Sequence, residues 1–235
     1  MDTESIKKYH RKLVGRAIEY KLGEFNHFLS KIIRTCKSVE SKFDRGIQPA
    51  DEGEDNINYV FNAFVNTFQS IIDALQTATD AKIDWKRFND VPHSKFIKNC
   101  RNAVAHDGMQ VINAYADGKY YVAAVIERID NRGSVVVINP PKEDILTVCV
   151  EFARGLIKEI MCIIEEHGRK IPLYDHTDYE QFFKEAMDST FIPQFAIDLM
   201  KENELQIKDS IKDLSYEIQP GIQNKIDEIE RLLAR

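Results

Sequence analysis

The sequence predicts a mainly α protein: an antiparallel helical bundle with a small inserted antiparallel β-meander and a helical C-terminal extension. Three observations lead to this prediction. Apolar residues recur at alternating steps of three and four over long stretches, as amphipathic helices require. Only 10 of the 235 residues are glycine and 7 are proline, which leaves room for long helices. Between about residues 110 and 139 the chain is instead rich in Val, Ile and Tyr and carries hairpin signals.

The first two helices follow from the apolar spacing of residues 6–43 and 57–78. The first stretch is one long helix or two, with Gly23 as the candidate break, because a glycine inside a helix costs about 1 kcal/mol relative to alanine. The polar run 48–55 predicts a loop between them. A loop this short predicts that the two helices pack as antiparallel neighbours.

A third helix is expected over residues 96–104. Pro92 suits its first turn, and Gly108 suits its end, since glycine accepts the left-handed conformation common just past a helix. The pattern then predicts three strands of one meander and a further long helix, at residues 111–115, 120–126, 134–138 and 145–163.

These elements divide the chain into a helical domain at residues 1–170, with the meander at about 110–139, and a helical C-terminal extension at 171–235. Prolines separate short helical patterns within the extension. This favours an appended region over a continuation of the bundle.

The charge of the chain is unevenly distributed. The net charge is -6 overall, but residues 1–142 carry +3 and residues 143–235 carry -9. A polyanion such as RNA is therefore expected to meet the first part, where residues 82–101 hold six basic and two acidic side chains. No uncharged stretch reaches membrane-spanning length, and the amino terminus carries charge where a signal peptide would be apolar, which predicts a cytoplasmic protein without a membrane partner.

Neither a cofactor nor a metal is expected. The four cysteines lie far apart and form no CxxC pair, so they indicate neither a disulfide framework nor a zinc site. The sequence also lacks a P-loop, a nucleophile elbow and a dinucleotide fingerprint.

The candidate active site is the segment Arg101-Asn102-Ala103-Val104-Ala105-His106, at the end of the third predicted helix. An arginine followed by a histidine after four to six residues also occurs at Arg87 and at Arg169. Of the three, only the middle match has a polar residue next to the arginine and lies at a helix end. This segment resembles the motif of the HEPN superfamily of helical bundle proteins.

The resemblance implies an HEPN-like bundle and a metal-independent endoribonuclease, an endonuclease of the hydrolase class, that acts as a homodimer on an RNA substrate. In such a dimer the Arg101, Asn102 and His106 side chains of both chains line one cleft. Histidine titrates near neutral pH and suits general acid or base catalysis, and arginine stabilises charge on phosphoryl oxygens. Asn102 would position the imidazole or a phosphate oxygen.

Two features of this segment leave alternatives open. Residues five apart on an ideal helix are rotated by about 140°, so Arg101 and His106 share a site only across a dimer, or if His106 lies just past the last regular turn. Lys95 and Lys98 are candidate substrate-binding residues, but lysines at such positions are more often a solvated helix face.

Other functions remain open at this point. The family resemblance implies a toxin, a defence effector or an RNA-processing enzyme, and a toxin implies an antitoxin or another protein partner. The main alternative is a non-catalytic HEPN domain that serves as a dimerisation, nucleotide-binding or protein-interaction module. A third is an unrelated helical interaction protein, in which His106 is only a cationic residue at a helix C-terminus.

Overall fold

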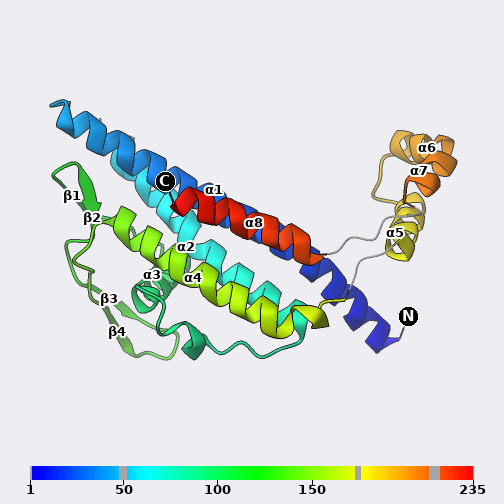
Figure 1. Cartoon of the computed structure of the whole chain (residues 1–235), viewed down its shortest axis with the longest axis horizontal. Helices are drawn as coiled ribbons and strands as arrows, with labels where there is room; N and C mark the ends of the chain where they lie inside the picture. The colour runs from blue at the N-terminus through cyan, green and yellow to red at the C-terminus, as the bar shows by residue number, and fades with distance from the viewer. Residues whose placement is uncertain (1, 48–51, 173–175, 212–217, 235) are drawn as a thin grey trace.

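The computed structural model describes residues 2–47, 52–172, 176–211 and 218–234. The described chain is mainly helical, with two small antiparallel sheets (Figure 1). None of its helices has the length and apolar character needed to cross a membrane.

The core of the bundle is formed by α1 (Thr3–Asp44), α2 (Glu52–Thr79) and α4 (Ile145–His167), which lie side by side (Figure 1). α1 and α2 run antiparallel, as predicted. Aromatic rings connect the three helices: Phe64 of α2 lies 5.0 Å from Phe25 of α1 and 6.3 Å from Phe152 of α4, between ring centroids. All three rings are fully buried, so their packing stabilises the arrangement beyond the apolar area that they remove from water.

The boundaries of the first two helices differ from the prediction. α1 is one helix of 42 residues, and Gly23 does not break it. Its neighbours Leu22 and Phe25 are fully buried, and burial of such side chains contributes about 1.5–3 kcal/mol each, more than the cost of the glycine. α2 begins at Glu52, inside the predicted loop 48–55; residues 48–51 lie outside the described part of the chain.

The third predicted helix is α3 (Ser94–Asp107), and it follows a 3₁₀ turn, η1 (Trp85–Phe88). Gly108 ends it with φ of 65°, as predicted. Pro92 precedes the helix rather than occupying its first turn, because His93 adopts a left-handed conformation with φ of 58° between them.

The predicted meander is two separate hairpins. β1 (Ala114–Ala116) pairs with β2 (Lys119–Tyr121), and β3 (Ile126–Ile129) pairs with β4 (Val135–Ile138). The predicted strand 120–126 is divided because the Asn113 side chain accepts a hydrogen bond from the backbone N–H of Ala123 at 2.8 Å, which ends the first ladder. Buried Asn58 of α2 anchors the segment before β1 by exchanging two hydrogen bonds with the backbone of Ile112.

The chain after residue 170 has two parts. After the 3₁₀ turn η2 (Gly168–Lys170), the helices α5 (His176–Met187), α6 (Gln194–Glu202) and α7 (Glu204–Ile211) lie away from the bundle (Figure 1). Here they are called the C-terminal arm. α8 (Ile218–Leu233) instead packs along α1 and α4 and adds four buried side chains to the core, Ile222, Ile226, Ile229 and Leu233.

The expectation of an appended region is therefore wrong for α8. Its apolar residues follow at steps of four and three, and such a stripe is buried against another helix wherever one is within reach.

The C-terminal arm is attached to the bundle at its start, where Lys12 of α1 forms an ion pair with Asp178 of α5 at 2.7 Å.

Candidate functional site

α3 positions the candidate motif. One face of the helix is buried through Phe96, Ile97, Cys100 and Ala103, and this fixes which side chains the helix turns outward. Arg101 and Asn102 are half-buried at the edge of that face, and His106 is exposed in the last turn. The motif therefore lies on the outer side of a helix that is held firmly by the core.

Arg101 carries a charge that no carboxylate neutralises among the described residues. Its Nη1 donates to Oδ1 of Asn102 at 3.1 Å. Its Nε is buried and has no hydrogen-bond partner in the described chain. The charge of this half-buried guanidinium is therefore not compensated by a carboxylate within the described chain, and Asn102 orients it.

The relation between Arg101 and His106 follows from the regularity of α3. The helix continues to Asp107, so His106 does not lie past the last regular turn, and that alternative is wrong. Within one chain the two side chains are therefore rotated by about 140°. Asn102 and His106, four residues apart, do share a face. Arg101 does not share that face within one chain.

Sequence reasoning missed a contact beside His106. Asp107 accepts a hydrogen bond at 2.5 Å from Nε of Arg128, a residue of β3. The side chain of Arg128 is 6% exposed and that of Asp107 is 27% exposed. The hydrogen bond from Arg128 lowers the pKa of Asp107 below its ordinary value of 3.8. This ion pair fastens the second hairpin to the end of α3; the two residues lie 21 positions apart, and no sequence pattern connects them.

The structure distinguishes two of the three arginine–histidine spacings. The guanidinium of Arg87 contacts Glu159 at 3.0 Å and Glu166 at 2.6 Å, so its charge is neutralised on α4. His93, the histidine that follows it, contacts Glu151 at 2.9 Å. In the third match, the side chain of His176 lies outside the described residues. Of the two spacings that can be compared, only the one at Arg101 leaves its arginine free of a carboxylate.

The two candidate lysines differ in their surroundings. Lys95 is exposed, in the first turn of α3. Lys98 is half-buried, with Nζ 4.5 Å from the centre of the Trp85 ring, and its burial lowers its pKa. Lys98 already makes a cation–π contact with Trp85, so Lys95 is the more available of the two lysines to bind a ligand.

Three of the four cysteines have buried side chains. Cys36, Cys100 and Cys149 are buried, and burial raises the pKa of the Cys36 thiol to about 12. A thiol with so high a pKa is not a nucleophile at neutral pH. No group of three or more His, Cys, Asp or Glu side chains suited to a metal lies within the described ranges.

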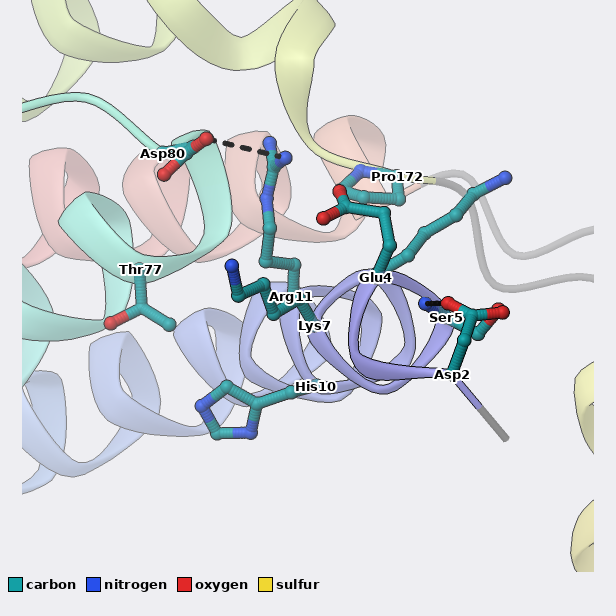
Figure 2. Close-up of a pocket in the computed structure, with 10 residues that line it drawn as sticks. Asp2, Glu4, Ser5, Lys7, His10, Arg11, Thr77, Asp80 and Pro172 are labelled. Carbon is teal, nitrogen blue, oxygen red and sulfur yellow. Dashed lines mark hydrogen bonds and ion pairs between the residues drawn. The ribbon is translucent and has the colours of Figure 1, made fainter.

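A hollow of about 820 Å³ opens at the start of α1 (Figure 2). Arg11 lies in it, with Nε bonded to the carbonyl of Ala78 at 3.1 Å and Nη2 to that of Lys170 at 2.7 Å. Figure 2 also shows its contact with Asp80, at 3.8 Å. Arg11 thus connects three segments of the fold, and we interpret this hollow as a structural junction.

Comparison with protein-family models, with curated proteins and with solved structures finds no match to this chain.

Proposed function

We propose that this protein is a metal-independent endoribonuclease of HEPN type, whose site is completed by a second copy of the chain. The observation that carries the proposal is the state of Arg101: its charge is unpaired in the described chain, and Asn102 orients it. His106 is exposed in the same helix, and the 140° rotation between the two favours a site that draws them from different chains.

The chemistry proposed for this site is cleavage of RNA by its own 2′-hydroxyl. The hydroxyl oxygen attacks the adjacent phosphorus, a new P–O bond forms, and the bond to the 5′-oxygen of the next nucleotide breaks. His106 of one chain accepts the proton of the 2′-hydroxyl, and the departing oxygen takes a proton from water. Arg101 stabilises the charge that develops on the phosphoryl oxygens. The products are a 2′,3′-cyclic phosphate and a 5′-hydroxyl.

A second function is favoured by the C-terminal arm. Five large apolar side chains are more than half exposed on it or between its helices, Phe182, Phe191, Phe195, Leu199 and Leu205. Residues 176–211 also carry eight acidic and three basic side chains. An acidic surface with exposed apolar residues suits a protein partner that presents basic and apolar groups. In the toxin or defence role this partner would be an antitoxin; without catalysis, the protein would be an interaction module.

The experiment that separates the two functions is RNA cleavage in EDTA by the wild type and by His106→Ala and Arg101→Ala. His10→Ala and Arg132→Ala are matched controls, because both side chains are exposed and lie outside α3. We expect cyclic phosphate ends from the wild type and from both controls. We expect a rate at least about 100-fold lower from the two site variants, as removal of a general acid or base, or of a group that stabilises the developing charge, gives.

Cleavage that persists in the His106 and Arg101 variants contradicts the site. A folded wild-type dimer that does not cleave RNA supports the interaction module instead.

A further inference from the structure

A second hollow, of about 300 Å³, lies where α1, the start of α4 and the end of α8 meet. Here it is called the bundle groove. Its walls are apolar and half-buried, and are formed by Ile33, Leu146, Val150 and Leu232. Apolar surface that stays accessible between packed helices is typical of a place where another element binds.

Two cations border the bundle groove. Lys37 of α1 is exposed and contacts no carboxylate among the described residues. Arg154 of α4 donates from Nη2 to the carbonyl of Leu233 at 2.7 Å, an acceptor that carries no charge. The carboxylate in the lining, Glu151, contacts His93 at 2.9 Å. The groove therefore favours an occupant that is both apolar and acidic.

Helix α6 of the C-terminal arm has a face of this composition. Phe195 and Leu199, four residues apart, are 74% and 59% exposed. Asp198 and Glu202 are exposed on the same side of the helix, and neither forms an ion pair within the part of the chain that the structure describes. These four residues are called the α6 face. Two apolar side chains one turn apart are the usual anchors of a helix that binds in a groove.

The α6 face is out of reach of the bundle groove of its own chain. α6 packs against α5 and α7, and α5 is held on α1 by the ion pair between Lys12 and Asp178. Lys37 lies 25 residues further along α1, which corresponds to about 38 Å. In Figure 1 the arm lies near the N-terminal end of α1, and the start of α4 lies at the opposite end of the bundle. The two surfaces can therefore meet only between two molecules.

We propose that the α6 face of one chain binds in the bundle groove of a second copy of this chain. The apolar residues of α6 pack against the apolar walls, and its two carboxylates lie near Lys37 and Arg154. Because each copy has one arm and one groove, a two-fold dimer makes this contact twice. The proposal rests on the interaction role proposed for the C-terminal arm, and RNA cleavage takes no part in it.

The test is an exchange of charges, followed by sedimentation of the full chain. Asp198→Lys with Glu202→Lys reverses the charge of the α6 face, and Lys37→Glu with Arg154→Glu reverses that of the groove. Each double variant alone should self-associate at least about tenfold more weakly than the wild type, because like charges then face each other in both contacts. An equimolar mixture of the two should regain wild-type affinity within about threefold, since opposite charges face each other again.

Two further double variants are matched controls. Glu185→Lys with Asp209→Lys changes the arm outside the α6 face, and Lys142→Glu with Arg231→Glu changes the bundle outside the groove. All four side chains are exposed. Their self-association should stay within about threefold of the wild type. Circular dichroism checks that every variant is folded.

Disulfide formation locates the contact directly. Cys162 is the exposed cysteine of the chain, so Cys162→Ser is the background for both partners. A protein with Leu199→Cys is mixed with one that carries Val150→Cys, and oxidation should link the two chains. Leu205→Cys in place of Leu199→Cys is the control, because Leu205 is exposed on α7, outside the α6 face, and it should link more slowly.

Three results overturn the proposal: a wild type that stays monomeric, a dimer that neither charge reversal weakens, or a mixture that associates no more tightly than its components. In the second case the arm is left to bind a different protein. The His106→Ala protein should self-associate as the wild type does. A failure of cleavage and a failure of this contact are therefore measured separately.

Discussion

The contacts of individual arginines carry most of the functional argument. Arg87 and Arg128 are each neutralised by carboxylates, whereas Arg101 contacts only the Asn102 amide among the described residues. A sequence shows which arginines precede a histidine, but not which of them meets a carboxylate 20 or 70 positions away. Local context in the sequence favours Arg101 over Arg87, and the structure shows that Arg87 is ion-paired on α4.

The ion pair beside His106 has a defined pH dependence. Because Arg128 lowers the pKa of Asp107 below 3.8, the stabilisation that the pair provides is fully present above the unfolded-state pKa. It is lost as the pH falls through the lowered value. In Arg128→Met we expect the pKa of Asp107 to rise towards 3.8, which carboxyl NMR titration measures.

The same variant should show reduced thermal stability above about pH 5, and the difference from the wild type should shrink in more acidic solution. Lys208→Met is the control, since its pair with Glu204 is exposed and such pairs contribute little. An unchanged Asp107 titration in Arg128→Met would show that the pair does not form in solution.

At the scale of elements, the positions of the helices could largely be predicted from the sequence, but the arrangement of the β-hairpins between α3 and α4 could not. The apolar spacing located α1, α2, α3 and α4 because each has one face in the core. The division of the meander depends on the Asn113 side chain, and the position of its first strand depends on Asn58, 54 residues away from its partner. Hydrogen bonds of this kind leave no periodic signal in the sequence.

Two glycines make a matched pair that tests how the elements pack. A Cβ on Gly155 of α4 would lie 2.8 Å from Cδ of Pro92 and 2.9 Å from Cγ1 of Val91, in the segment before α3. A Cβ on Gly23 of α1 would meet nothing within 4 Å. We expect Gly155→Ala to lower the free energy of unfolding by about 1–3 kcal/mol through overpacking, and Gly23→Ala to raise it by about 1 kcal/mol.

Urea denaturation of both variants measures these changes. If Gly155→Ala proved as stabilising as Gly23→Ala, the close packing of α4 against the segment before α3 would be contradicted.

At the scale of the whole molecule, the final helix belongs to the bundle and the arm before it does not. The sequence pattern could not assign α8 to the bundle or to the C-terminal arm, because an amphipathic stripe does not show which other helix packs against it. Its buried residues Ile222, Ile226 and Ile229 are fully enclosed. Leu205 of the C-terminal arm is 81% exposed.

Because of this difference in burial, we expect truncation of an apolar side chain to lower the stability of the protein in α8 but hardly to change it in the C-terminal arm. Ile226→Ala should lower the free energy of unfolding by about 2–5 kcal/mol, because it leaves a cavity in the core. Leu205→Ala should change it by no more than about 0.5 kcal/mol. Chemical denaturation of both variants decides the matter, and an Ile226→Ala protein of wild-type stability would show that α8 is not docked in solution.

The central claim is that Arg101 of one chain and His106 of another form one RNA-cleaving site, and mixing two inactive variants tests it most directly. Arg101→Ala and His106→Ala proteins are unfolded together, refolded as a mixture and assayed for RNA cleavage in EDTA. Each mixed dimer holds one intact pair of residues across its symmetry axis. The account predicts that the mixture recovers about a quarter of the wild-type rate, because about half of the dimers are mixed and each keeps one of the two Arg101–His106 pairs of the cleft. No recovery, with mixed dimers shown by mass spectrometry to be present, would contradict it.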